Sequence, residues 1–360
     1  MTPPPDPKMH GFFQTRSVRV QWAVLIAGSA LFAAVLEVAG LPAALLLGPM
    51  IAGILMSSNG GSIRAPRLPV LAAQTVVGCL VARAITGDIV VAFVKDWPLL
   101  LGVVLVIVAT SAVLGWTMAR FKVLPGTTAI WGTAPGAASA MMVLAGAFGA
   151  DARLVAFMQY LRVVIVAALA SAVARLWVGT SGAVVPHIVW FPAVPWHDFL
   201  ATLALAGVSG ALGVVLRIPA GALLLPMLAG AVLESMGLVT IILPPWLLAL
   251  SYAFLGWSIG LGFTREILGH ASRALPGVLL AIFAMISICG VLAVLLVYAA
   301  GIDPLTAYLA TSPGGMDAVA IIAASSNVDI AFVMAMQSLR FLIVLVTGPP
   351  LARFIAQRLT

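Results

Sequence analysis

The stretch TAPGAASAM, Thr133–Met141, recurs in altered form as TSPGGMDAV, Thr311–Val319. Each copy places a proline and a glycine, Pro135-Gly136 or Pro313-Gly314, inside a long apolar run. Such a pair breaks a helix, and a broken helix in hydrocarbon leaves backbone groups that cost several kcal/mol each unless protein or water satisfies them. We therefore expect both breaks to face an internal cavity, and a new half-helix to begin after each one.

The composition places the chain in a membrane. Of its 360 residues, 63% are hydrophobic and 8% are charged, whereas a soluble domain carries about 25% charged residues. The net charge of +7 comes from basic residues spread singly along the chain, which indicates membrane topology and not a nucleic-acid surface. Cys79 and Cys289 lie far apart in apolar runs and predict neither a disulfide nor a metal framework.

Ten apolar segments are candidates for crossing a hydrocarbon core about 30 Å thick, which takes about 20 helical residues. They lie near 21–38, 42–57, 69–86, 97–119, 152–175, 198–216, 219–236, 245–264, 275–300 and 329–352. Two further apolar stretches, 125–148 and 304–327, carry the Pro-Gly pairs. Residues 1–20 are rich in proline and basic side chains, and we expect them to form a retained cytoplasmic tail.

The two halves of the chain match each other in register. The matches keep a nearly constant offset and include Pro42 with Pro219, Pro49 with Pro226, Gly53 with Gly230, Gly78 with Gly256, Asp151 with Asp329, Gln159 with Gln337 and Arg162 with Arg340. Chance hardly produces such an ordered series. The series predicts one membrane repeat at 21–178, an interfacial connector at 179–197 and a second repeat at 198–360.

The direction of the repeats depends on whether the Pro-Gly stretches cross the membrane. If each enters and returns on one side, a half has five spans and the copies are inverted; if each crosses, a half has six and the copies are parallel. With five spans and a cytoplasmic N-terminus, thirteen Lys or Arg residues lie inside and three outside, against ten and six with six spans. Basic residues prefer the cytoplasmic side. We therefore favour an all-α integral membrane protein of about ten transmembrane helices in two inverted five-helix repeats, each with a Pro-Gly-broken hairpin, and both termini in the cytoplasm.

Two arginines are predicted near the middle of the membrane. Arg162 and Arg340 each follow an aspartate by eleven residues, which is about 16 Å of helix. Guanidinium groups beside the positive N-termini of half-helices favour an anion, most simply a carboxylate. In the alternative interpretation each arginine only clamps carbonyl groups of its hairpin and holds the fold together.

The predicted substrate site combines both breaks with the helices that follow them. It comprises Thr133, Pro135, Gly136, Ser139, Gln159, Arg162, Thr311, Ser312, Pro313, Gly314, Gln337 and Arg340. Thr133 and Thr311 are expected near the caps of the second half-helices. Asp317 stands where the first copy has Ser139, and it is a candidate for coupling to a proton or sodium ion or, alternatively, for neutralising Arg340.

Several chemistries lack the residues they need. The four histidines, His10, His187, His197 and His270, lie outside the predicted spans and form no metal-spaced cluster with cysteines or carboxylates. The chain has no P-loop and no nucleotide-binding glycine motif. The sequence therefore predicts no catalytic residues, no metal site and no cofactor.

The motifs LLLGPMIAGIL, WGTAPGAASAMM, DARLVAFMQYLRV and TSPGGMDAVAIIAASSNVDIAFVMAMQSLRFLIV resemble the bacterial AbrB membrane family. The resemblance covers nearly the whole chain beyond the N-terminal tail. This family has a duplicated membrane domain and differs from the soluble DNA-binding regulator of the same name. Its members are often labelled ammonia monooxygenases, and one is named as a regulator of gene expression. The resemblance implies, at the level of the fold, a relation to secondary transporters with inverted repeats.

Three functions follow as hypotheses. The first is a secondary transporter of a small, anionic solute across the bacterial inner membrane, which is not an enzyme. The second is a membrane-embedded regulator of gene expression that transports nothing. The third, disfavoured by the missing metal ligands, is an ammonia monooxygenase. The expected partners are a small-molecule or ion substrate and the lipid bilayer, with no nucleic acid; association into a homo-oligomer is left open.

Overall fold

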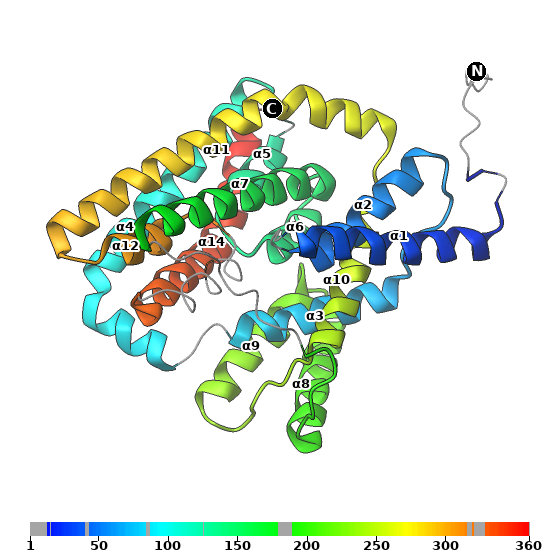
Figure 1. The fold of residues 1–360 in the computed structure, drawn as a ribbon, viewed down its shortest axis with the longest axis horizontal. Helices are drawn as coiled ribbons and strands as arrows, with labels where there is room; N and C mark the ends of the chain where they lie inside the picture. The colour runs from blue at the N-terminus through cyan, green and yellow to red at the C-terminus, as the bar shows by residue number, and fades with distance from the viewer. Residues whose placement is uncertain are drawn as a thin grey trace.

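The computed structural model describes residues 13, 14, 16–39, 43–83, 87–124, 126–178, 189–314, 319 and 328–359. Within these residues the chain is helical, with no strands, and the helices are joined by short turns (Figure 1). The first helix begins at Val18, so it includes the last three residues of the tail expected at residues 1–20. Asp317 and most of the predicted connector lie outside the described residues.

The described part of the first half contributes seven helices. They are α1 (Val18–Val38), α2 (Ala44–Ser58), α3 (Arg67–Arg83), α4 (Gly87–Arg120), α5 (Gly126–Thr133), α6 (Ala138–Ala147) and α7 (Ala152–Val178). The described part of the second half contributes α8 (Trp196–Val215), α9 (Gly221–Ser235), α10 (Pro245–Gly260), α11 (Arg265–Ala300), α12 (Pro304–Thr311) and α14 (Ile330–Leu359). Each of the ten predicted spans overlaps a helix.

Six helices of the described residues are long and apolar enough to cross a membrane, as expected of a multi-pass membrane protein. These spans are Val18–Val38, Trp97–Arg120, Ala152–Leu169, Trp196–Val215, Arg265–Ala300 and Ile330–Phe354. Helices α2, α3, α9 and α10 have 15 to 17 residues, or about 23 to 26 Å of helix. They are shorter than the hydrocarbon core of about 30 Å.

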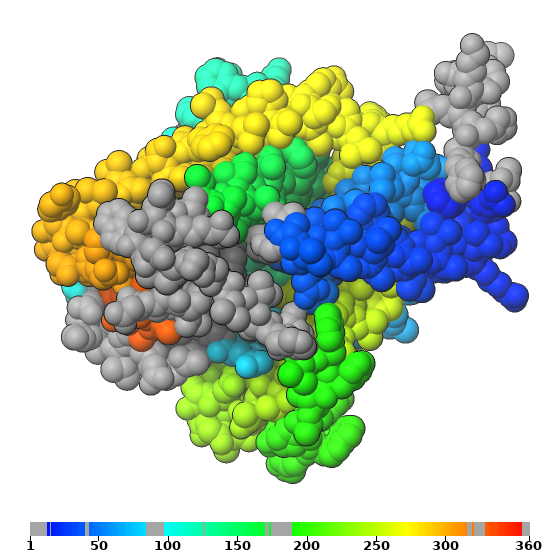
Figure 2. Space-filling model, in the orientation of Figure 1, coloured from blue at the N-terminus to red at the C-terminus, as the bar shows by residue number. Residues whose placement is uncertain are grey.

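The outer helices expose apolar side chains. Leu31 of α1 is 62% exposed, Val208 of α8 is 71% exposed and Leu280 of α11 is 73% exposed. In Figure 2, α1 and α8 protrude at the edge of the molecule, and α11 runs along its upper side. Many large apolar side chains exposed together are unusual on soluble monomers, and they suit contact with lipid.

Local signals start and end the helices. Asp303 caps α12 by accepting a hydrogen bond from the backbone N–H of Thr306 at 3.0 Å, and Pro304 occupies the first helical turn. Gly301, with φ 66°, ends α11 in the left-handed conformation. Ala43 and Ala220 precede α2 and α9 with φ of 57° and 55°, so the same unusual turn occurs at matching positions of the two halves.

The helices fall into two groups, which Figure 1 shows at lower right and upper left. In the first group, α2 packs against α1 and α10, and α9 packs against α8 and α3. These helices approach very closely: a Cβ built on Gly78 would lie 2.4 Å from the carbonyl oxygen of Leu223, and one built on Gly256 would lie 2.7 Å from that of Leu46. In the first contact the glycine belongs to the first half of the chain and the leucine to the second half. In the other contact the assignment is reversed.

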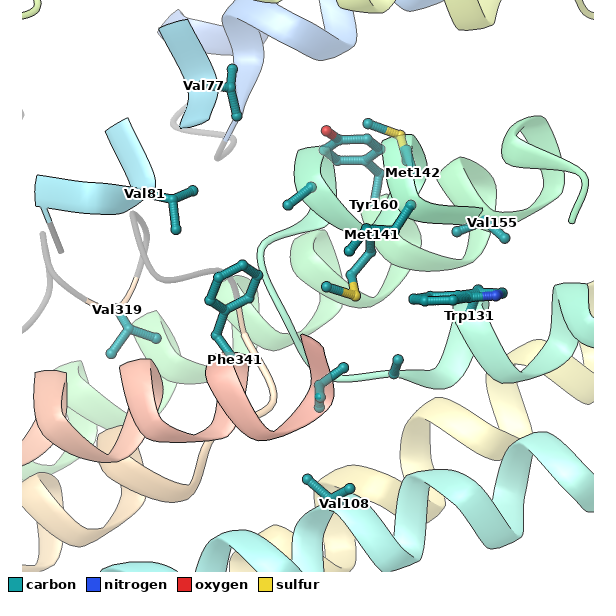
Figure 3. Close-up of a cluster of buried hydrophobic side chains, with 14 of the residues drawn as sticks. Val77, Val81, Val108, Trp131, Met141, Met142, Val155, Tyr160, Val319 and Phe341 are labelled. Carbon is teal, nitrogen blue, oxygen red and sulfur yellow. The ribbon is translucent and has the colours of Figure 1, made fainter. Parts of the chain in front are cut away.

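The second group consists of α4, α5, α7, α11, α12 and α14. Helix α4 packs along α14, α5 packs against α7, and α12 packs against α14. Figure 3 shows part of the buried core, in which Met141 and Met142 of α6 lie near Tyr160 of α7. Val77 and Val81 of α3 belong to the same apolar cluster. Helix α6 therefore lies where the two groups meet.

Candidate functional site

The first Pro-Gly break separates α5 from α6. Helix α5 ends at Thr133, residues 134–137 are not helical, and α6 begins at Ala138. Ala134, Pro135 and Gly136 are buried, so the freed backbone groups are shielded from solvent. The prediction of a break at Pro135-Gly136 and of a new helix after it is confirmed.

The two ends of the broken segment meet. The backbone N–H of Asp151 donates to Oγ1 of Thr128 at 3.1 Å, which joins the residue before α7 to the first turn of α5. In the second half, the backbone N–H of Asp329 donates to Oγ1 of Thr306 at 3.2 Å. In each half, therefore, the start and the end of the broken segment lie next to each other.

A glutamine and an arginine of α7 bind the carbonyl groups that the first break exposes. Gln159 Nε2 donates to the carbonyl oxygens of Trp131 at 2.8 Å and Ala134 at 2.9 Å. Arg162 Nη1 donates to Ala134 at 3.0 Å, and its Nη2 donates to Gln159 Oε1 at 2.7 Å. These contacts satisfy carbonyls that lack a partner at the C-terminal end of α5.

The second break has the same contacts at the matching positions of the second half. Gln337 Nε2 donates to the carbonyl oxygens of Leu309 at 2.9 Å and Ser312 at 3.2 Å. Arg340 Nη1 donates to Ser312 at 2.8 Å, and its Nη2 donates to Gln337 Oε1. We call each glutamine–arginine pair with its carbonyl contacts a clamp. The carbonyl-binding role of the arginines, one of the two interpretations above, is thus present in the structure.

The hydroxyls of the two threonines at the breaks bond within the helix that each threonine ends, and for Thr133 this differs from the expected role. The hydroxyl of Thr133 donates back to Ala129 at 3.0 Å, within α5, and α6 has no side-chain cap. The hydroxyl of Thr311 donates back to Ala307 at 3.0 Å, within α12. The expectation that Thr133 caps α6 is wrong, because a hydroxyl in the last turn of a helix reaches the carbonyl four residues earlier more readily than an N–H beyond the break.

Both clamp arginines are buried cations. Arg162 is 3% exposed and Arg340 is 1% exposed, and no carboxylate of the described residues forms an ion pair with either. The Nε atoms of Arg162 and Arg340 and the hydroxyl of Ser312 have no hydrogen-bond partner among the described residues. A cavity of about 20 Å³ lies beside Arg162 and Thr133, which is room for one water molecule.

The structure brings the second break against the first half. A Cβ built on Gly314 would lie 3.2 Å from Cγ1 of Val166, one turn beyond Arg162 on α7. A Cβ built on Gly348 of α14 would lie 3.1 Å from the Trp131 ring of α5. Ser312 and Pro313 are buried with Gly314. The residues of both breaks and both clamps therefore gather in one interior region.

A larger cavity, of about 540 Å³, lies beside α6 and between the two groups of helices. Its polar lining consists of Arg67, Gln74, Ser139, Arg153, Arg217 and Ser258, with no carboxylate among the described residues. We call it the Arg67 cavity. Of the predicted site residues, only Ser139 lines it. Sequence reasoning used its three arginines as topology markers and missed that they converge, because they lie far apart in the chain.

Arg153 is already paired within this cavity. Its Nε and Nη2 donate to the two carboxylate oxygens of Asp151 at 2.9 and 3.0 Å, and its Nη1 donates to the carbonyl of Gly262 at 2.8 Å. Burial alone would raise the pKa of the Asp151 carboxyl, but its hydrogen bonds with Arg153 hold the pKa below the ordinary value of 3.8. Asp151 also caps α7 through the backbone N–H of Arg153.

Metal ligands do not cluster in the described residues. No group of three or more His, Cys, Asp or Glu side chains there could hold a metal ion. Cys79 and Cys289 are both buried and free. The polar side chains that the structure describes around the two breaks carry amide, guanidinium and hydroxyl groups, which suit an anion better than a cation.

Comparisons with known proteins place the chain in a family. Residues 45–356 match the family described as "Transition state regulatory protein AbrB". The chain is 51% identical over 338 residues to "Putative regulator AbrB" of Escherichia coli (strain K12), covering 94% of this chain and 97% of that protein. It is 27% identical over 288 residues to "Uncharacterized protein YhjN" of Bacillus subtilis (strain 168), covering 74% and 73% of the two. No solved structure matches the chain. The chain therefore belongs to the AbrB family.

Proposed function

We propose that the protein is a secondary transporter that moves a small anion across the bacterial inner membrane. The observation that carries the proposal is the pair of buried guanidinium groups at the two breaks, each with an Nε–H that has no partner among the described residues. Burying a charge costs several kcal/mol unless an opposite charge or hydrogen bonds compensate for it. The clamp contacts supply part of this compensation, and an anion that reaches the breaks would add the opposite charge.

The proposed architecture has ten transmembrane helices in two inverted repeats, with the clamps near the midplane. The meeting of Thr128 with Asp151, and of Thr306 with Asp329, supports hairpins that enter and return on one side. The exchange of contacts between Gly78–Leu223 and Gly256–Leu46 supports a two-fold relation between the halves. Breaks in corresponding positions of two halves are typical of the midplane sites of secondary transporters.

The Arg67 cavity adds an independent argument for five spans in each half. Arg67, Arg153 and Arg217 line one cavity, and a cavity of this size is too small to reach across a hydrocarbon core of about 30 Å. Five spans place all three arginines in the cytoplasm, whereas six spans place Arg153 and Arg217 outside while Arg67 stays inside. The common cavity supports the five-span topology, with both termini in the cytoplasm.

In the proposed mechanism, the clamps position the broken segments and leave donors for the substrate. Arg162 and Arg340 each use Nη1 and Nη2 for carbonyl and glutamine contacts, and the Nε–H, which has no partner in the part of the chain that the structure describes, would bind a carboxylate or phosphate oxygen. The hydroxyl of Ser312, also without a partner in that part, is a further donor beside Arg340. Asp317 remains the proposed residue for coupling to a proton or sodium ion.

A second candidate is a membrane-embedded regulator that transports nothing. The name of the Escherichia coli relative favours it. In that case the clamps have only a structural role, and the buried arginines hold the two breaks in place. The two candidates differ in whether any solute crosses the membrane.

Flux into proteoliposomes tests the proposal. The purified chain is reconstituted and assayed with radiolabelled succinate, acetate and phosphate, with and without sodium and a pH gradient. We expect uptake of at least one anion, loss of uptake in Arg340→Gln, and reduced uptake in Ser312→Ala. The serine variant removes a hydroxyl that has no partner among the described residues, so it should remain folded. Thr347→Val, which removes a hydroxyl bonded only within α14, is its control. Absence of uptake for all three anions, or normal uptake by Arg340→Gln, would contradict the proposal.

A further inference from the structure

The Arg67 cavity differs from the two breaks in size, in charge and in access. It has a volume of about 540 Å³, within the range of small-molecule sites, whereas the space beside Arg162 holds about 20 Å³. Arg67 and Arg217 are exposed at its margin, and Met142 and Leu255, each 2% exposed, form its deep wall. The cavity therefore extends from the surface to the core beside α6.

The contacts of the three lining arginines show how much positive charge in the cavity is not paired with a described carboxylate. Arg153 is neutralised by Asp151 through a two-point ion pair. Arg67 begins α3 and Arg217 lies in the turn between α8 and α9, and the side chain of neither has a hydrogen bond or ion pair with the described residues. Two cations from different elements thus remain without a partner around one cavity, within the part of the chain that the structure describes.

We propose that the Arg67 cavity binds a small dianion, such as a dicarboxylate or phosphate, on the cytoplasmic side of the protein. Two free guanidinium groups match two negative charges, and guanidinium binds carboxylate and phosphate oxygens through paired hydrogen bonds. Gln74 and Ser139 add neutral donors to the lining, whereas the Ser258 hydroxyl already donates to the carbonyl of Leu255 at 2.7 Å. The proposal rests on the proposed transport function for its biological role, which is to receive the anion before it reaches the breaks.

Ser139 links the cavity to the first break. It lies in the first turn of α6, three residues after Gly136, and it is the member of the predicted substrate site that faces this cavity. An anion held by Arg67 and Arg217 would therefore lie on the route to the N-terminal end of α6, which carries a partial positive charge. A lipid phosphate at the membrane surface would bind the same two arginines without reaching Ser139.

The three arginines of the cavity are not repeated at the corresponding positions of the other half of the sequence. In the register of the repeats, the positions that correspond to Arg67, Arg153 and Arg217 are Pro245, Ala331 and Gly40. Ser139 corresponds to Asp317. The repeat therefore does not supply a second set of these three arginines.

Calorimetric titration of succinate into the full-length protein, in neutral detergent, tests the inference. We expect saturable binding that is weakened about tenfold or more in Arg67→Gln and in Arg217→Gln, since a hydrogen bond to a charged group contributes enough for such a change. Arg67→Lys and Arg217→Lys keep the charge and should retain part of the affinity. Arg273→Gln is the matched control, because Arg273 is exposed on α11 and donates only to Gly269.

Other outcomes would overturn the inference. They are no succinate or phosphate binding to the wild-type protein, equal loss in Arg273→Gln, and unchanged affinity in both glutamine variants. Titration of succinate in nanodiscs of phosphatidylcholine and of phosphatidylglycerol separates the sources of the anion. If succinate binds in phosphatidylcholine but not in phosphatidylglycerol, the arginines bind lipid phosphate instead. Binding to the Arg67 cavity without any flux would contradict the transport function and support the cavity site. Flux that is unaffected in Arg67→Gln and Arg217→Gln would support the transport function and contradict the role of the cavity.

Discussion

The backbone N–H of Asp151 donates to the hydroxyl oxygen of Thr128 across 23 residues, at 3.1 Å. This bond closes the segment that contains the first Pro-Gly break, and Thr306 and Asp329 close the second in the same way. A helix that crossed the membrane would separate its ends by about 30 Å. The closure therefore supports the proposed course, in which the segment enters and returns on one side of the membrane.

Replacing Thr128 by valine should destabilise the protein by about 1 kcal/mol, because the partly buried N–H of Asp151 loses its acceptor while the shape of the side chain is kept. Thermal unfolding in detergent measures the loss. Thr117→Val is the matched control, since the Thr117 hydroxyl bonds only to Leu114 within its own helix. An equal effect of the two substitutions would contradict the closure.

Cysteine labelling tests the same closure in the membrane. We expect Phe121→Cys, before α5, and Ala147→Cys, at the end of α6, to react with an impermeant maleimide from the same side. Val189→Cys, in the connector, should react from the opposite side. All three positions are exposed, whereas Cys79 and Cys289 are buried. Reaction of positions 121 and 147 from opposite sides would mean that the segment crosses.

The pair of Asp151 and Arg153 should make stability depend on pH. The pKa of Asp151 is held below 3.8 by Arg153, so the folded state favours the carboxylate. Its contribution is present above the unfolded pKa and is lost as the pH falls through the lower folded value. Asp151→Asn keeps a capping group but removes the charge. At pH 7 we expect the variant to be less stable by at most about 1 kcal/mol, because both side chains are partly solvated.

This difference should shrink as the pH falls below 3.8. Unfolding of the wild-type protein and Asp151→Asn, compared at pH 7 and at acidic pH, measures it. A constant difference at all pH values would show that the charge of Asp151 does not stabilise the fold.

The close approach of α3 and α9 should not tolerate a side chain. Gly78→Ala would place a Cβ 2.4 Å from the carbonyl oxygen of Leu223, and forcing the two backbones apart costs about 1–3 kcal/mol or more. Gly102→Ala on α4 is the control, since a Cβ there meets nothing within 4 Å and alanine favours the helix by up to about 1 kcal/mol. Relative to the wild-type protein, the free energy of unfolding should fall in Gly78→Ala and rise in Gly102→Ala. Changes of the same sign in the two variants would contradict the packing.

Much of the fold could be predicted from local pattern. Every predicted span overlaps a helix, because long apolar runs bounded by proline, glycine and charge have few other solutions in a membrane. Asp151 and Asp329 each precede a helix and accept a backbone N–H from its first turn, which is a local arrangement of short polar side chains at helix starts. The register of Gln159 with Arg162 on one helix face followed from helical spacing alone.

The sequence by itself determined that this chain is helical, that its two halves carry matching breaks, and that a guanidinium group follows each break. These are local properties, set by side-chain hydrophobicity, by the missing N–H of proline and by the period of the helix. Only the tertiary structure decided what the guanidinium groups bind, where the hydroxyl of Thr133 points, and that Arg67 and Arg217 share a cavity. Those relations join residues far apart in the chain, and their geometry depends on how α3, α6, α8 and α9 pack together.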